Sequence, residues 1–201
     1  MAGRRLIVLE ELRVILSADS TAERMLRAVA AHLATGGDYC IADMVDRDGT
    51  LRRLEIAHAD PSRRERLRVA AEHTRFEPEG RVSTLLRTGG AEVVGRLTRA
   101  GAARASDLAL LQGETAGSYM AAAVVVSGAP MAVLTIVACQ VGRQFDNDEL
   151  GFLRVIAEWT GLGLENALRR EQQSSRDTVP PLSAFRTKEP VTGRARIVRS
   201  R

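Results

Sequence analysis

Few side chains in this 201-residue chain have the types and spacing that covalent or metal chemistry needs. The two cysteines, Cys40 and Cys139, are too few for a disulfide framework or a four-thiolate zinc site. Each is expected to be a reduced core residue on a strand. The sequence also has no glycine-flanked serine of the hydrolase type and no His-Glu-x-x-His pair. We therefore expect a protein that is not an enzyme.

Two short stretches imitate binding loops. Asp46-Arg47-Asp48-Gly49, followed by Glu55, resembles part of a calcium loop, but Met44 stands where the first carboxylate should be. Strand periodicity on both sides favours a hairpin turn instead. Gly161-Leu162-Gly163 lies inside a helical pattern without a third glycine or a preceding strand, so it is not a dinucleotide loop. These glycines would permit close approach of another backbone.

Basic residues gather at the C-terminal end of the chain. Residues 174–201 hold seven of the 29 lysine and arginine residues but only two of the 25 acidic ones, so the preceding body is nearly neutral. Their Ser- and Pro-rich composition does not supply a packed core. We predict a flexible basic tail, most simply a solvated extension. The rival hypothesis, contact with nucleic acid or an acidic partner, predicts strongly salt-dependent binding.

The chain has no segment typical of membrane insertion. The Leu6–Leu9 run is broken by Glu10 and Glu11 and lacks a small-residue cleavage pattern, so it fits neither a signal peptide nor a membrane span. No later stretch approaches about 18 uninterrupted apolar residues. We expect a cytoplasmic protein without membrane contact.

Two helices should open the chain. Apolar residues recur at helical spacing over 6–16, which predicts a short amphipathic helix. Ser20 followed by Glu23 fits a capping box, which predicts that a second helix begins there. Gly36-Gly37 should end this helix.

A strand hairpin is expected next. Period-two alternation over 39–45 and 51–58, with Asp48-Gly49 between them, predicts two antiparallel strands joined by a tight turn. The alternation divides the first strand into two sets of residues on opposite faces, Tyr39, Ile41, Asp43 and Val45 on one and Cys40, Ala42 and Met44 on the other.

Helices and strands then alternate. Asp60-Pro61 predicts an N-cap with proline at the first helical position, opening a helix that runs to about Thr74. A shorter helix should end at Gly89-Gly90. The remaining expected elements are a strand at 91–94, one or two helical turns at 106–111, and an antiparallel pair at the centre of a sheet at 118–126 and 130–141.

The last helix has the best-defined start. Asp146 can cap it, Glu149 can complete the capping box, and Phe145 can pack onto Leu150. Steps of three and four residues then mark an apolar seam of Leu150, Leu153, Ala157, Thr160, Leu164 and Ala167. Such a seam packs either within the subunit or against a second copy.

This order of elements fits an α+β fold, an antiparallel sheet of five to six strands flanked by helices, with a long C-terminal helix. Several strings support it: Asp38-Tyr39-Cys40-Ile41-Ala42-Asp43 ahead of Asp48-Gly49, His58-Ala59-Asp60-Pro61, Leu86-Arg87-Thr88-Gly89, Gly117-Ser118, Phe145 with Asp148-Glu149-Leu150, and Leu164-Glu165-Asn166-Ala167. In their order and spacing they resemble the GAF domain, a sensory module of bacterial signalling proteins.

The resemblance covers roughly residues 20–170. Together with the helix pattern and the composition of the C-terminal end, it divides the chain into an N-terminal helix (1–19), a GAF-like domain (20–173) and the tail (174–201). The resemblance also implies a small-molecule pocket between one sheet face and the intervening helices. No kinase, cyclase or phosphatase output domain fits in the remaining residues, so we expect the domain to act through a signalling partner.

Ligand contacts in such a pocket are expected from the segment around 74–119 and its facing strands. The candidates are His73, Glu92, Arg96, Ser118 and Tyr119. Each has an alternative: His73 as a surface helix residue, Arg96 as a solvated loop charge, and Tyr119 as a core aromatic with a hydrogen-bonded hydroxyl. The cofactor and the ligand stay unknown.

Several ligand classes of the family fit poorly. The cyclic-nucleotide pattern of an Asn-Lys pair is missing, since the only lysine is Lys188 in the tail. Aromatic residues make up 3% of the chain, few for a bilin pocket. Haem would need His58 or His73 in the pocket. The sulfoxide-reducing members use a group of cysteines that two cannot reproduce.

The leading hypothesis is a non-enzymatic sensory protein that dimerises through its terminal helices, with Leu150, Leu153, Ala157 and Leu164 as contacts. The alternative is a ligand-free module for protein-protein interaction. Nucleic-acid contact through the tail is a further, less favoured option.

Overall fold

The computed structural model describes residues 2–18, 20–36, 38–46, 48–72, 76–96, 117–140 and 142–177. The helical turns expected at 106–111 and the tail beyond 177 lie outside these ranges. The elements are α1 (Ala2–Ser17), α2 (Ala22–Leu33), the short 3-10 helix η1 (Ala34–Gly36), β1 (Tyr39–Val45), β2 (Leu51–Ala57), α3 (Pro61–Ala71), α4 (Arg81–Thr88), β3 (Ala91–Val94), β4 (Tyr119–Val126), β5 (Ala129–Val137) and α6 (Asn147–Asp177).

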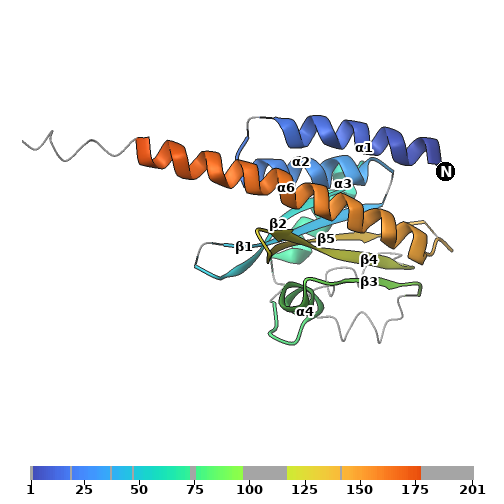
Figure 1. Cartoon of the computed structure of the whole chain (residues 1–201). Coiled ribbons are helices and arrows are strands. Elements are labelled where there is room, and N and C mark those ends of the chain that lie inside the picture. Colours follow the sequence, from blue (N-terminus) through green and yellow to red (C-terminus); the bar gives the residue numbers. More distant parts are fainter. Residues whose placement is uncertain are drawn as a thin grey trace, which may run out of the picture.

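The strands of the described residues form one antiparallel sheet in the order β2-β1-β5-β4-β3. β4 and β5 lie inside it, as expected, and a two-residue turn joins them. Ser127 and Gly128 of this turn have φ angles of 50° and 83°. Positive φ at both positions matches the right-handed twist of paired strands. The α+β prediction of an antiparallel sheet with a long C-terminal helix is thus confirmed (Figure 1).

The alternation of the strands sorts side chains between two faces. Cys40 and Ala42 of β1 belong to the core beneath the terminal helices, whereas Tyr39 and Ile41 pack on the opposite side, as the pattern predicts. A register shift between Ala42 and Asp43 inserts an extra residue in β2. We call the side with Cys40 and Ala42 the helix face and the side with Tyr39 and Ile41 the α3–α4 face.

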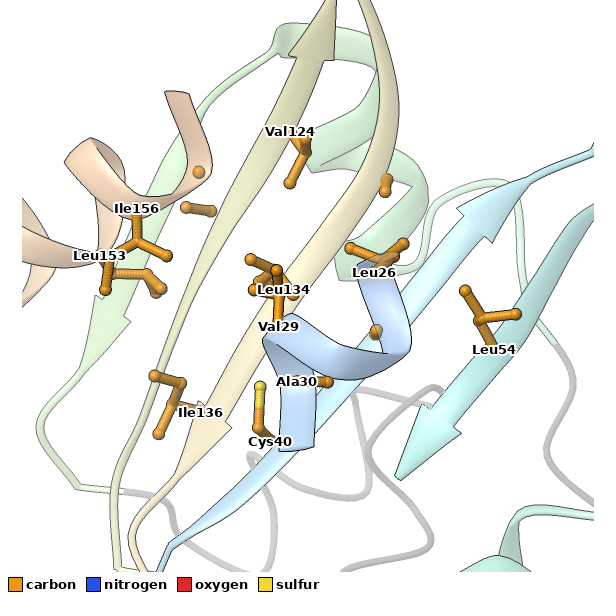
Figure 2. Packing of buried hydrophobic residues seen from close by; sticks show 14 of the residues in the cluster. Leu26, Val29, Ala30, Cys40, Leu54, Val124, Leu134, Ile136, Leu153 and Ile156 are labelled. Atoms are coloured by element: carbon orange, nitrogen blue, oxygen red, sulfur yellow. The ribbon is translucent and has the colours of Figure 1, made fainter. Parts of the chain in front are cut away.

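The helix face holds one continuous hydrophobic core. α1, α2 and α6 cover it (Figure 1), and Figure 2 shows members of this cluster from α2 (Val29), β5 (Leu134) and α6 (Leu153 and Ile156). All four side chains are fully or almost fully buried. Each such burial stabilises the fold by about 1.5–3 kcal/mol.

Two glycines let α6 lie close against its neighbours. A Cβ atom on Gly161 would stand 2.2 Å from the backbone oxygen of Val125 in β4. A Cβ atom on Gly163 would stand 2.8 Å from Cδ2 of Leu16 and 3.0 Å from Sδ of Met25. The close backbone approach expected at these glycines is therefore confirmed at Gly161, whereas Gly163 makes room for side chains.

Two helix starts follow the sequence signals. Asp60 accepts a hydrogen bond from the Ser62 N–H at 2.8 Å, with Pro61 in the first turn of α3. At the start of α6, Asp146 accepts from the Glu149 N–H at 2.8 Å and the Glu149 carboxylate accepts from the Asp146 N–H at 3.2 Å. Both predicted caps are confirmed.

The predicted cap of α2 is wrong by one residue. Thr21, not Ser20, accepts from the Arg24 N–H, and Glu23 forms an ion pair with Arg52 instead of closing a box. The reason is tertiary. Glu171 of α6 accepts the Ala22 N–H at 2.8 Å and satisfies a donor at this helix end.

α6 corrects two predictions. It continues to Asp177, so residues 174–177 belong to the helix rather than to the tail. The whole predicted seam is buried against the chain's own sheet and helices, including the four residues assigned to a dimer contact: Leu150, Leu153, Ala157 and Leu164. Since these side chains already fill the core, a second copy cannot reach them.

Candidate ligand-binding site

The α3–α4 face combines small apolar clusters with charged side chains. Leu67 of α3 packs with Tyr39 and Tyr119, and α4 packs on Ala121 and Val133 through Val82 and Leu85. Figure 1 shows α4 on the side of the sheet opposite α6. Residues 73–75 and 97–116 lie outside the described ranges, so the site is built from the strands, α3 and α4.

One polar group joins β3, β4 and α4. The Tyr119 hydroxyl donates to Oε1 of Glu92 at 2.9 Å, and Nη1 of Arg81 donates to the same oxygen at 2.9 Å. The Arg81 guanidinium also lies 5.2 Å from the centre of the Tyr119 ring. The β3–β4 register sets Glu92 opposite Ala121, diagonal to Tyr119 on one face. We call Arg81, Glu92 and Tyr119 the Glu92 group.

A second polar group joins β1 and β2. Asp43 is fully buried, and Arg53 donates to its two carboxylate oxygens at 2.9 and 3.3 Å. The Arg53 guanidinium lies 5.2 Å from the centre of the Phe76 ring. A two-pronged pair fixes both side chains and compensates the buried carboxylate. We call Asp43 and Arg53 the Asp43 pair.

His58, just after β2, holds a buried donor. Nδ1 accepts the Asp60 N–H at 2.8 Å, which places the ring proton on Nε2. Nε2 is buried, and no described residue gives it a hydrogen-bond partner; the ring centre lies 4.5 Å from that of Tyr39. An unpaired buried donor costs free energy that a ligand acceptor would recover.

The five predicted ligand contacts do not lie together in one site. Glu92 and Tyr119 are brought into one group. Ser118 is fully buried, and its hydroxyl donates to the Val94 oxygen at 2.8 Å and accepts the Phe145 N–H at 2.9 Å, so it connects β3 and β4 to the segment before α6. Arg96 is exposed after β3, and His73 lies outside the described residues. Ligand contact by any of the five stays a prediction.

Sequence reasoning missed Arg81, Asp43 and Arg53. Asp43 had a signal, because the alternation placed an acidic residue in line with Tyr39 and Ile41. A buried carboxylate calls for a cation across the hairpin, which is Arg53. Arg81 had no comparable signal, since only the fold brings the start of α4 to Glu92.

The two cysteines lie on opposite faces. Cys40 is fully buried on the helix face, where burial, and then the charges of Asp43 and Glu55, raise the pKa of its thiol far above the usual value. Cys139 is partly buried beside the cluster of Tyr39. In the described part of the chain, no three His, Cys, Asp or Glu side chains gather as a metal site would require. None of the described helices is both long and apolar enough for a membrane crossing.

Terminal helices on one sheet face, and short helices over buried polar groups on the other, define an α+β domain built on one antiparallel sheet. The sequence matches the GAF domain over residues 17–164, and the chain belongs to the GAF domain family. Members of this family are generally sensory or regulatory modules of signalling proteins. No curated protein matches the sequence.

Solved structures show the same fold at low sequence identity. The GAF domain of an Acinetobacter phosphoenolpyruvate-protein phosphotransferase is 17% identical, with 84% of this chain and 97% of that chain covered and a TM-score of 0.60. The nlh2 GAF domain of A. aeolicus, in an inactive state, is 20% identical over 82% and 96% of the chains, with a TM-score of 0.57. A free methionine-R-sulfoxide reductase from Neisseria meningitidis, in complex with its substrate, is 18% identical over 81% and 89%, with a TM-score of 0.59.

Proposed function

We propose that this chain is a non-enzymatic, cytoplasmic sensory protein of signal transduction that binds a small molecule on the α3–α4 face. The observation that carries the proposal is the Glu92 group. An arginine and a buried tyrosine hydroxyl converge on one carboxylate oxygen, beside the small side chain of Ala121. A few convergent polar groups among apolar side chains are typical of ligand sites. The Nε2–H of His58 is a further hydrogen-bond donor for a polar ligand.

The fold supplies a route from this face to α6. β4 carries Tyr119 and Ala121 on the α3–α4 face and Ala122 and Val124 on the helix face. Ser118 bonds the start of β4 to Phe145, which directly precedes the α6 cap. A ligand that shifts β4 would therefore also shift the start of α6. Occupancy would change the equilibrium between two positions of this helix.

Dimerisation through the terminal helices is the second part of the proposal, and it uses their outer surface. Arg5 lies over Phe152 and Leu16 beside Gly163, so α1 and α6 run parallel. Each helix exposes large apolar side chains at seven-residue spacing. They are Ile7 and Val14 on α1 and Val155 and Leu162 on α6, with Leu6 and Trp159 beside them. Apolar residues that recur every seven positions favour a helix bundle between two copies.

One observation favours the alternative, a ligand-free interaction module. The charges of both polar groups are already compensated within the chain, Glu92 by Arg81 and Asp43 by Arg53. Under this hypothesis the α3–α4 face is filled by its own side chains. The exposed surface of α1 and α6 would then bind a different protein.

Native mass spectrometry of the full chain, purified from the cells that produce it, tests ligand binding. We expect discrete mass in excess of the polypeptide, reduced by Glu92→Gln but not by the matched change Glu65→Gln on the exposed side of α3. A bare polypeptide mass that persists after incubation with the small-molecule extract of those cells would falsify ligand sensing and favour the interaction module.

Sedimentation equilibrium tests the dimer. We expect the wild-type chain to sediment as a dimer and Trp159→Glu to sediment as a monomer. Val69→Glu, which changes a similarly exposed apolar residue on α3, should leave the dimer intact. A wild-type monomer at every concentration would refute this part of the proposal and leave ligand binding unaffected.

A further inference from the structure

A cavity of about 380 Å³ lies on the helix face, on the other side of the sheet from the Glu92 group. Its walls come from α1, the end of α2, the paired strands β4 and β5, and the first turns of α6. The apolar lining includes Val8, Leu33, Met120, Ile136, Phe152 and Ile156. Figure 2 shows two of them, Ile136 on β5 and Ile156 on α6. A cavity of this size and character is in the range of small-molecule sites.

The acidic groups of this cavity are already paired. Arg143 donates to Asp38 at 3.2 Å and to Glu149 at 2.9 Å, and its guanidinium lies 4.8 Å from the centre of the Phe145 ring. Asp38 also accepts the Cys139 N–H at 3.2 Å. Both carboxylates therefore face a cation and donors within the chain. Because Asp38 and Glu149 share Arg143, this arginine has no excess positive charge for a ligand.

Arg5 is the exception. Its guanidinium lies 5.3 Å from the centre of the Phe152 ring at the edge of the cavity, and it forms no ion pair with any described residue. His32, the other basic residue of the lining, has its Nε2 3.5 Å from the Glu11 carboxylate. Asp38 and Glu149 share the single cation Arg143, so among the described residues of the lining Arg5 is the one arginine without a carboxylate partner, and it stands partly buried beside the apolar side chains.

We infer that this cavity is a second binding site, for a small amphipathic anion with a compact apolar body and one carboxylate. The apolar body lies against Met120 and Ile136, and the carboxylate pairs with Arg5. Burial of the body supplies the affinity, at about 25 cal/mol for each Å² of apolar surface removed from water. The charge-assisted bond to Arg5 supplies the selectivity for an anion.

Occupancy of this site would act directly on the terminal helices. The ligand touches α1 through Val8 and Arg5 and α6 through Phe152 and Ile156, so it holds the N-terminal half of α1 against the start of α6. These helices carry the proposed dimer surface. The site is independent of ligand binding on the α3–α4 face, and it gives the protein a second chemical input.

Methyl NMR on the full chain, with ¹³C-labelled Met and Ile methyl groups, tests the inference with sodium octanoate. We expect saturable shifts at Met120, Ile136 and Ile156. The methyls of Ile41 and Ile56, which lie on the α3–α4 face, should not move. 1-Octanol and octylamine share the apolar body without the carboxylate, and each should bind about tenfold more weakly than octanoate.

Two variants locate the anion contact and the cavity. Arg5→Gln should weaken octanoate about tenfold, and Arg13→Gln, on an exposed arginine of the same helix, should not. Val8→Trp should fill the cavity and abolish the shifts, with circular dichroism confirming its fold. Arg5→Gln retains the apolar lining, so it tests the site even if Val8→Trp unfolds.

Three results would overturn the inference. The first is the absence of saturable shifts on the helix face. The second is equal affinity for octanoate and octylamine, or unchanged affinity in Arg5→Gln, either of which removes the anion contact. The third is a response confined to Ile41 and Ile56. That result would assign octanoate to the α3–α4 face, which supports the proposed function while it refutes this second site.

Discussion

The two faces of the sheet share the same strands but differ in what they bury. On the helix face, α2 and α6 close over one apolar core, and polar atoms are rare within it. On the α3–α4 face, two smaller apolar clusters alternate with the Asp43 pair and the Glu92 group. β1 illustrates the division most simply, since Ala42 belongs to the core and Asp43, the next residue, carries a buried charge.

This difference suggests that the helix face contributes mainly to the stability of the fold and the α3–α4 face mainly to ligand binding. Away from the cavity beside α1, the apolar core of the helix face is close-packed and tolerates little change in volume. Ion pairs and hydrogen bonds can exchange partners with a ligand at little net cost, since the ligand replaces one polar contact by another. We therefore expect substitutions in the apolar core of the helix face, away from the cavity beside α1, to act mainly on stability. On the α3–α4 face, substitutions that leave the buried charges compensated should act mainly on binding.

Gly161→Ala should have the largest effect. Its Cβ would collide with the backbone oxygen of Val125, and a strand backbone cannot move aside as a side chain can. We expect the free energy of unfolding to fall by about 3 kcal/mol or more, measured by urea denaturation. Gly151→Ala is the matched control in the same helix, because beyond the adjacent backbone of α6 no described atom lies within 4 Å of its added Cβ. It should stabilise slightly, by up to about 1 kcal/mol. Equal effects of the two changes would refute close packing at β4.

Arg53→Met tests the most deeply buried charge of the α3–α4 face. It would leave the fully buried Asp43 carboxylate without its cation, and we expect a loss of about 3 kcal/mol. Adding Asp43→Asn should restore part of that loss, because the second change removes the uncompensated charge. If the double variant is less stable than Arg53→Met, the carboxylate has another role than pairing with this arginine.

The sequence predicts the parts of the fold that depend on local pattern. Alternation in β1 assigned Cys40 and Tyr39 to opposite faces, and the Asp146 cap set the start of α6. The α2 cap was misplaced because Glu171, which satisfies the Ala22 N–H, is far away in sequence. In the candidate site, too, local pattern and tertiary packing contributed separately. Arg81 came to Glu92 only through the packing of α4, which no local pattern encodes.

Tyr119→Phe should have a smaller effect on stability than either change above. It removes one hydrogen bond to Glu92, whose carboxylate keeps Arg81, so we expect a loss of about 1 kcal/mol. Under the proposed function it should nevertheless lower ligand occupancy in native mass spectra. A stability loss near that of Gly161→Ala, with unchanged occupancy, would make Tyr119 a core residue of the kind found on the helix face.

The cysteines provide the comparison with the smallest expected effect on stability, since each face of the sheet holds one of them. Iodoacetamide at pH 8 should modify the partly buried Cys139 in the folded protein and leave Cys40 unmodified until unfolding, as read by peptide mass spectrometry.

Burial raises the pKa of Cys40 in the folded state, so only the unfolded chain ionises this thiol above its ordinary pKa of about 8.5. The folded state then binds more protons than the unfolded one. Stability is complete below that pH and falls as pH rises, by about 0.8 kcal/mol at pH 9. Cys40→Ala should lose this part of the alkaline slope, whereas Cys139→Ala should keep it. Equal alkylation of both thiols would show that the helix face opens as readily as the α3–α4 face.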